Sequence, residues 1–383
     1  MPTTTNTPGL VPSLLRGGAP FLVAVAFAIV MQLVVRPNID PYPAKLLLDI
    51  GVNCILAISL TMVNGFTGQF SMGHAGFMAV GGYASGTVTY YASLLIWDSG
   101  DSRGGRLSGL IARDDVHLWL TSGDGLFLVS LIIGGLVAAG LGYLVGLPSL
   151  RLKGDYLAIV TLGFGEIVRV IIQQTSPILA TAEEARQTPL YRLPTHVGGS
   201  LGFSGIPFYT GLFWVYLGVA ITLIVAFRLK TSTFGRAFLS IRSDEIAAEA
   251  MGVNTTRYKV WAFVIAAFFA GIAGGLFAHT LGVGLSPEAA GFMRSFDVII
   301  MVVLGGLGSV SGAVAAAIIV TLLPEWLRSV ADYRMIIYAL ALILIMIFRP
   351  KGLFGVREVW EKAAWTWLFP KKPGGGQGGA GRA

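Results

Sequence analysis

Long apolar stretches alternate along the chain with short polar connections. Stretches without a charged residue include Gly125 to Gly146, Val260 to Thr280 and Val298 to Leu323. A helix rises 1.5 Å per residue, so about 20 residues cross a hydrocarbon core of roughly 30 Å. Backbone groups in lipid need internal partners, and these stretches lack the apolar/polar alternation of barrel strands. The pattern therefore predicts an all-α, polytopic helical membrane protein.

The pattern predicts about nine to ten transmembrane segments, some of them broken by glycine. We expect Asp297 to cap the helix that opens a broken pair, because an aspartate side chain can accept a bond from a free N–H group. The expected spans are Ala19 to Val35, Ala44 to Val63, Met72 to Ile96, Gly125 to Gly146, Asp155 to Gln174, Pro207 to Phe227, Val260 to Thr280, a broken pair across Asp297 to Leu323, and Val330 to Phe348.

Composition supports the membrane class. The chain has 383 residues, of which 54% are hydrophobic and 12% charged, and its mean hydropathy is +0.73. Soluble domains carry about a quarter charged residues. The net charge of +7 does not indicate nucleic acid, because the basic residues are spread over loops and tail. The single cysteine, Cys54, excludes an intramolecular disulfide and a cysteine-rich metal site. No metal or cofactor is expected.

The distribution of lysine and arginine predicts the orientation and the domain limits. Cytoplasmic loops of membrane proteins are enriched in these residues. We expect a cytoplasmic N-terminus (1–18), a transmembrane domain (19–349) and a cytoplasmic basic, glycine-rich tail (350–383). Loops 97–124 and 176–206 are then extracytoplasmic, and the basic loop 228–259 is cytoplasmic. The same orientation predicts a multi-pass protein of the cell (inner) membrane.

Two glycine-rich segments share the pattern G-x-x-G-x-x-S. They run from Gly65 to Ser71 and from Gly305 to Ser311, and each interrupts an apolar region. Paired interruptions in two halves of a membrane protein often line a transport pathway. Close helix packing is the alternative explanation for these glycines. The candidate pathway residues are Gly65, Gly68, Gln69, Ser71, Gly73, His74, Gly305, Gly308 and Ser311.

The basic loop contains a predicted short helix. We expect Ser243 to cap its N-terminus and Gly252 to close it in a left-handed conformation. Ile246 and Met251 would protrude, which suits docking into the groove of a partner protein. No lysine of the chain follows a glycine, so a P-loop for ATP is absent. The candidate coupling residues are Ser243, Asp244, Glu245, Ile246, Ala247, Ala248, Glu249, Met251 and Gly252.

At this loop the sequence resembles the LivM family, the permease subunits of ABC importers for branched-chain amino acids. The segments that carry the resemblance are Asn64 to Phe77, Leu150 to Ile167, Ile246 to Asn254, Val303 to Gly308 and Arg349 to Gly355. The importer motif E-A-A followed by glycine appears as Ile246-Ala247-Ala248 and Gly252, with isoleucine in place of glutamate. The resemblance implies no enzyme activity of the chain itself. It implies a heterodimer with a second permease, two cytoplasmic ATP-binding subunits and an extracytoplasmic substrate-binding protein, all around a lipid bilayer.

Other interpretations stay open at this stage. Urea or short-chain amides could be the cargo, since the family extends to them. An ion-driven secondary transporter would need no ATPase. An intramembrane hydrolase would use Ser71 with His74 or His279, although G-x-S-x-G is absent. Glu166 and Arg169, one helical turn apart, are expected to form an intramembrane ion pair.

Overall fold

A computed structural model describes residues 10–97, 122–149, 155–280, 284–330 and 333–348, together with 352, 353, 355 and 358. Most of the insertion at 97–124, residues 1–9 of the N-terminus and most of the tail 350–383 lie outside the described residues. The helices are α1 (Leu10–Val30), α2 (Pro41–Leu60), α3 (His74–Trp97), α4 (Ser122–Ser149), α5 (Asp155–Gln173), α6 (Ala182–Gln187), α7 (Leu212–Thr231), α8 (Thr233–Ser243), α9 (Glu245–Ala250), α10 (Thr255–Ala278), α11 (Phe292–Gly305), α12 (Val310–Trp326) and α13 (Arg334–Phe348).

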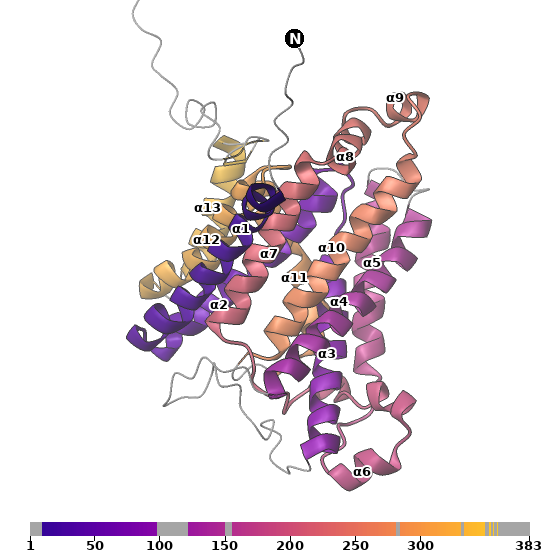
Figure 1. The fold of residues 1–383 in the computed structure, drawn as a ribbon, viewed down its shortest axis with the longest axis vertical. Coiled ribbons are helices and arrows are strands. Elements are labelled where there is room, and N and C mark those ends of the chain that lie inside the picture. Colours follow the sequence, from indigo (N-terminus) through magenta and orange to yellow (C-terminus); the bar gives the residue numbers. More distant parts are fainter. Residues whose placement is uncertain are drawn as a thin grey trace, which may run out of the picture.

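The all-α membrane class is confirmed (Figure 1). The described residues contain no strand, only a single antiparallel bridge between Phe203 and Leu285. Within the part of the chain that the structure describes, six segments are long and apolar enough to cross a membrane. They are Pro20–Asn38, Pro41–Gly65, Gly123–Leu147, Tyr156–Gln173, Leu212–Thr231 and Thr255–Ala278. The expected nine to ten transmembrane segments also include α3, the α11–α12 pair and α13, which are not among these six segments.

The centre of the bundle is α2. Every residue from Ile50 to Gly65 is buried. A helix that is apolar all round belongs in a core, and α2 packs against α7, α10, α11 and α12. Its last turn, Thr61–Gly65, widens into a π-helix before the chain leaves the helix.

Close glycine contacts hold α3, α4 and α10 together. A Cβ atom placed on Gly81 would lie 2.2 Å from the Gly271 Cα atom, and one on Gly142 would lie 2.6 Å from the Ala267 Cβ atom. No added side chain fits at such distances, and at Gly81 and Gly271 the two backbones are in contact. Small residues at these positions therefore set the distance between the three helices.

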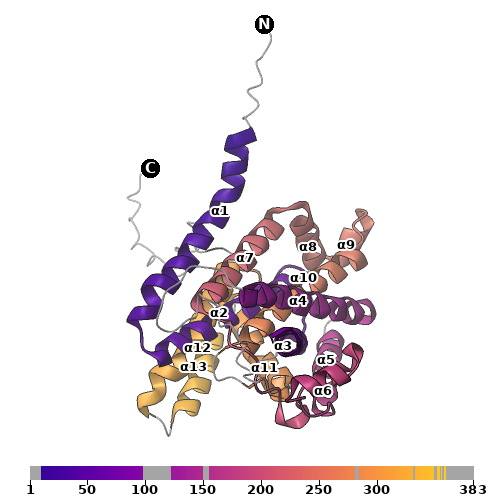
Figure 2. The same ribbon diagram turned by 60° about the horizontal axis from the view of Figure 1, so that its bottom comes forward.

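The first helix lies at the edge of the bundle. Figure 2 shows α1 extending away from the other helices. Only 11% of the Pro20–Asn38 segment is buried. Its main neighbour is α7, which it meets through the edge-to-face pair of Phe27 and Tyr216.

The two polar loops lie at opposite ends of the molecule. Figure 1 places α8 and α9 at the top and α6 at the bottom. These helices belong to the basic loop 228–259 and to the loop 176–206 respectively. The glycine-rich segments follow α2 and α11, and the first of them lies at the α8 end, because Arg242 of α8 donates a hydrogen bond to the Gly65 carbonyl oxygen.

The expected role of Asp297 is wrong. Helix α11 begins at Phe292, five residues earlier, so Asp297 lies inside the helix. Gly291 precedes it and offers no side chain for a cap. Instead, Glu166 on α5 accepts a hydrogen bond from the Phe292 N–H at 3.1 Å. The cap comes from a neighbouring helix, which a local sequence pattern cannot reveal.

Candidate functional site

The two glycine-rich segments lie against each other. Gly65 ends the π-helical turn of α2, and Gly308 lies between α11 and α12. A Cβ atom on Gly65 would come within 2.7 Å of the Gly308 nitrogen. The sequence repeat therefore marks a point of backbone contact.

The break between α11 and α12 is a tight reversal. Gly306 and Gly308 have φ angles of +106° and +95°, which only glycine adopts readily. The Ser309 side chain caps α12 by accepting from the Gly312 N–H at 3.1 Å. A Cβ atom on Gly305 would lie 2.5 Å from the Gly312 carbonyl carbon, so the two helices touch as they separate. The predicted broken hairpin is confirmed.

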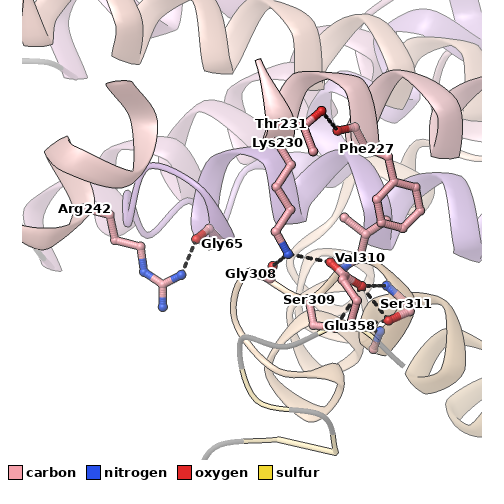
Figure 3. Close-up of polar contacts among 11 residues, drawn as sticks. Gly65, Phe227, Lys230, Thr231, Arg242, Gly308, Ser309, Val310, Ser311 and Glu358 are labelled. Carbon is pink, nitrogen blue, oxygen red and sulfur yellow. Dashed lines mark hydrogen bonds and ion pairs between the residues drawn. The ribbon is translucent and has the colours of Figure 1, made fainter. Parts of the chain in front are cut away.

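One cation from the basic loop holds each segment (Figure 3). The Arg242 guanidinium, on α8, donates to the Gly65 carbonyl oxygen at 2.7 Å. The Lys230 ammonium, in the last turn of α7, donates to the Gly308 carbonyl oxygen at 3.0 Å. Backbone carbonyls at helix ends lack partners within their own helix, and these side chains supply them. The basic loop is thereby attached directly to both interruptions.

A carboxylate from the tail completes the site. Glu358 is 3% exposed, and its carboxylate pairs with the Lys230 ammonium at 2.5 Å. It also accepts from the backbone N–H groups of Val310 (3.2 Å) and Ser311 (3.0 Å) and from the Ser311 hydroxyl (2.5 Å). Figure 3 shows these contacts converging on the first turn of α12. A carboxylate there satisfies free N–H groups and complements the positive end of the helix.

The surroundings of Glu358 favour its charged form. Burial by itself would raise the pKa of the Glu358 carboxyl. Hydrogen bonds from Lys230 and Ser311, with the charge of Lys230, outweigh burial and lower this pKa below its ordinary value of 4.5. No local pattern points to Glu358, because the tail around it is basic and rich in glycine.

The short helix of the basic loop exists as predicted, with a different cap. Helix α9 starts at Glu245, and the Asp244 side chain accepts from the N–H groups of Ile246 (2.9 Å) and Ala247 (3.0 Å). Ser243 is instead the last residue of α8. The expectation that Ser243 caps the helix is therefore wrong. The aspartate carboxylate reaches two N–H groups, which a serine hydroxyl one position earlier cannot do.

The outer face of α9 is apolar and exposed. Ile246 is 74% exposed and Met251 is 85% exposed. Gly252 closes the helix with φ +85°, as expected. Ala248, by contrast, is only 4% exposed and faces the chain itself. A docking surface on this helix is therefore made by Ile246 and Met251, while Ala248 supports it from behind.

The acidic residues of α9 attach it to α10. The Glu245 carboxylate pairs with the Lys259 ammonium at 2.5 Å. The Glu249 carboxylate accepts from the Thr255 hydroxyl at 2.5 Å. These contacts fix α9 relative to α10, so a force on α9 reaches the long helices of the bundle.

The structure does not support a serine hydrolase. The Ser71 hydroxyl is buried without a hydrogen-bond partner among the described residues. His74 bonds to Ser59 at 2.7 Å, and the Ser59 hydroxyl donates to the Leu56 carbonyl oxygen. His279 bonds to Thr89 at 2.7 Å. Neither histidine can therefore act as a base for Ser71.

The remaining predicted pathway residues lie in the same junction. Gly68, with φ +71°, adjoins the Arg242 side chain, and Gln69 is 7% exposed. A Cβ atom on Gly73 would lie 2.1 Å from the Thr161 carbonyl oxygen of α5. These residues make a packed joint between α2, α3, α5 and the α11–α12 break. Their part in a translocation pathway stays a prediction.

Glu166 and Arg169 form the ion pair that their spacing predicts, and its place inside the membrane stays a prediction. Arg169 Nε lies 2.6 Å from Glu166 Oε2. Because Glu166 also caps α11, this pair joins α5 to the start of the broken hairpin. Among the described residues, no group of three or more histidine, cysteine, aspartate or glutamate side chains could hold a metal ion.

Apolar helices of spanning length, joined at a glycine break and tied to a polar loop, define a multi-pass membrane transport protein. Comparison with known sequences gives its family. The chain belongs to the family described as branched-chain amino acid transport system, permease component, whose model matches residues 42–348. No solved structure matched the chain.

Relatives of known function agree with this family. The high-affinity branched-chain amino acid transport system permease protein LivM of Salmonella typhimurium is 36% identical over 315 residues, which are 78% of this chain and 67% of that protein. LivM of Escherichia coli is 35% identical with the same coverage. The permease protein LivH of Escherichia coli is 25% identical over 309 residues, 80% of this chain and 92% of LivH. These relatives are transport permeases, which favours a permease over an enzyme or an ion-driven transporter.

Proposed function

We propose that this chain forms half of the translocation pathway of an ATP-driven importer for branched-chain amino acids, and that its basic loop receives the mechanical stroke of separate ATPase subunits. The names of the LivM and LivH relatives support the cargo. The attachment of Arg242 to Gly65 and of Lys230 to Gly308 supports the coupling.

The contacts suggest how the stroke is transmitted. An ATPase that grips Ile246 and Met251 would move α9, and the Glu245–Lys259 pair would carry that movement to α10. Helix α8 follows, and Arg242 then pulls on the Gly65 carbonyl. Because the two glycine segments are in backbone contact, one displacement acts on both halves of the joint. Alternating access would result from rigid-body movement about this joint.

The proposed partners are a second permease, two cytoplasmic ATP-binding subunits and an extracytoplasmic substrate-binding protein. LivM and LivH both match this chain over about four-fifths of its length, which supports pairing of two related permeases. The exposed outer face of α1 leaves room for lipid or for such a subunit.

The proposed orientation places α8 and α9 in the cytoplasm of a cell with this protein in its inner membrane, with both termini on the same side. The basic residues of loop 228–259 support it. Single cysteines can test it in a Cys54→Ser background. Met251→Cys, at an 85% exposed site, should react with a membrane-impermeant maleimide only from the cytoplasmic side. Leu201→Cys, at a 94% exposed site, should react only from outside. The opposite pattern would refute both the orientation and the coupling role.

Coupling is tested by weakening the two attachments in the reconstituted complex. Arg242→Gln with Lys230→Gln should reduce leucine uptake about tenfold or more while ATP hydrolysis continues, since each loses a charged hydrogen bond. Arg236→Gln, an exposed residue of the same loop, is the matched control. If the double variant transports leucine normally, these contacts do not carry the stroke.

A further inference from the structure

A groove between α4 and α10 is polar at one end and apolar along its length. It has a volume of about 670 Å³. Its polar end is formed where α10 begins, at Asn254, Thr256 and Arg257. The remaining lining residues are Leu136, Ala139, Gly140, Tyr143, Leu147, Val260, Trp261 and Val264.

The length of the groove matches one leaflet of a bilayer. From Asn254 to Val264 the helix rises about 15 Å, which is half of a hydrocarbon core of roughly 30 Å. Tyr143 and Trp261 are 50% and 45% exposed on its walls. Aromatic side chains of this kind gather where the hydrocarbon meets the headgroups. The groove therefore runs from the membrane surface toward the bilayer midplane.

The polar end carries a free positive charge. Arg257 is exposed, and no carboxylate among the described residues lies within salt-bridge distance of it. The neighbouring cation, Lys259, is in contrast paired with Glu245 at 2.5 Å. None of the described residues that line the groove is acidic. The first turn of α10 adds the positive end of a helix dipole next to Arg257.

Gly140 leaves the middle of the groove open. A Cβ atom placed on Gly140 would meet nothing within 4 Å. The nearby Gly142 is different, because its added Cβ atom would collide with Ala267 of α10. On α4, Gly142 therefore allows close contact with α10, whereas Gly140 leaves space in the groove.

We propose that this groove binds an anionic phospholipid, with an acyl chain lying along Gly140 and the phosphate held by Arg257. A phospholipid has an anionic headgroup and an apolar chain, which match the positive end and the apolar length of the groove. A helix of another subunit would instead have to supply an acidic residue to pair with Arg257. Because Asn254 connects α9 to α10, the bound headgroup would lie beside the proposed coupling helix. The inference does not depend on the proposed cargo.

The test measures lipid binding to the intact purified complex by native mass spectrometry, with phosphatidylglycerol and phosphatidylcholine as probes. The wild-type complex should retain phosphatidylglycerol in preference to phosphatidylcholine. Arg257→Gln should reduce that preference about tenfold, as expected for loss of a charged hydrogen bond. Arg236→Gln, an exposed cation on α8, should not change it. Gly140→Leu should displace the lipid by filling the channel.

Gly163→Leu is the control for Gly140→Leu. Gly163 lies on an exposed face of α5, and a Cβ atom there also meets nothing within 4 Å. Unchanged phosphatidylglycerol binding in both Arg257→Gln and Gly140→Leu would overturn the proposal. A second result would also overturn the proposal. If Gly140→Leu releases the second permease from the complex while lipid binding is unchanged, the groove is a subunit interface. If Gly140→Leu folds poorly, the Arg257→Gln result decides alone.

Discussion

The two glycine-rich segments share a sequence pattern but differ in how they are held. The segment 65–71 follows a π-helical turn, and its closing serine, Ser71, has a buried hydroxyl with no partner among the described residues. The segment 305–311 joins two antiparallel helices, and its closing serine, Ser311, bonds to Glu358 through both its N–H and its hydroxyl.

The shared residue pattern of the two segments and the difference in their contacts have separate physical causes. Glycine recurs because the two backbones meet at Gly65 and Gly308, where no side chain fits. The polar contacts follow from what surrounds each segment. Among the described residues, one charged side chain, that of Arg242, bonds to the first segment, whereas two, those of Lys230 and Glu358, bond to the second. The first segment is therefore the weaker side of the joint and the easier one to move.

Removing Glu358 should have the largest effect on this asymmetry. Glu358→Ala leaves the half-buried Lys230 without its carboxylate and frees the first N–H groups of α12. Breaking a buried pair in this way costs about 3–5 kcal/mol. The thermal unfolding midpoint of the purified chain should fall accordingly, while Arg242→Ala should lower it less. An equal loss for both would mean that the two segments are held equally well.

A methyl group at the contact should have the next largest effect. Gly65→Ala forces a Cβ atom to within 2.7 Å of the Gly308 nitrogen, which the backbone must relieve by moving. Overpacking of this kind costs about 1–3 kcal/mol. Gly163→Ala, where the added atom meets open space, should leave the unfolding midpoint unchanged or slightly higher. Equal midpoints for the two variants would show that the segments are not in contact.

The two closing serines should respond in opposite ways. Ser311→Ala removes a hydrogen bond to a charged group and should destabilise the chain by about 1.5–3 kcal/mol at most. Ser71→Ala removes an unpaired buried hydroxyl and should be neutral or stabilising. Chemical denaturation of both variants measures the difference. Destabilisation by Ser71→Ala would reveal a partner for that hydroxyl.

Acid should weaken one segment before the other. Because the folded pKa of Glu358 is below 4.5, the stability it contributes is fully present above that value and is lost as the pH falls through the folded pKa. The melting-temperature gap between wild type and Glu358→Gln should therefore be constant near pH 7 and shrink below about pH 4.5. A gap that stays constant down to pH 3 would place the titrating group elsewhere.

Much of the fold could be predicted because lipid imposes one strong requirement. Unbroken apolar stretches gave α4 and α5 to within a few residues. Other boundaries moved where polar residues continue a helix beyond the apolar stretch, as at Thr255, which starts α10 five residues before the expected Val260. The hairpin break was predictable because Gly305 to Ser309 interrupts an otherwise continuous apolar run.

The site could be predicted only in part, since its decisive contacts join residues far apart in the chain. The tail holds two acids, Glu358 and Glu361, and no local pattern says which returns to α12. Lys230 and Arg242 belong to the basic loop that predicts the orientation of the chain. Nothing in the sequence near them indicates that they bond to the carbonyl oxygens of Gly308 and Gly65. The cap of α9 was missed by one residue, because Ser243 and Asp244 are both good capping residues, and the Ser243 hydroxyl instead donates to the Leu239 carbonyl oxygen within α8.

The edge position of α1 gives the bilayer itself access to the joint. Helix α1 packs on α7 through Phe27 and Tyr216, and the π-helical turn that follows α1 (Met31–Val35) contacts α7 through the Gln32 side chain, which accepts from the Phe213 N–H at 3.3 Å. Helix α7 in turn ends at Lys230, which holds the break. A thinner or thicker membrane that changes the tilt of α1 therefore acts on α7 first and reaches the Gly308 carbonyl without passing through the α2 core. The thickness of the host membrane is therefore expected to affect the conformation of the α11–α12 break, independently of substrate and of ATP hydrolysis.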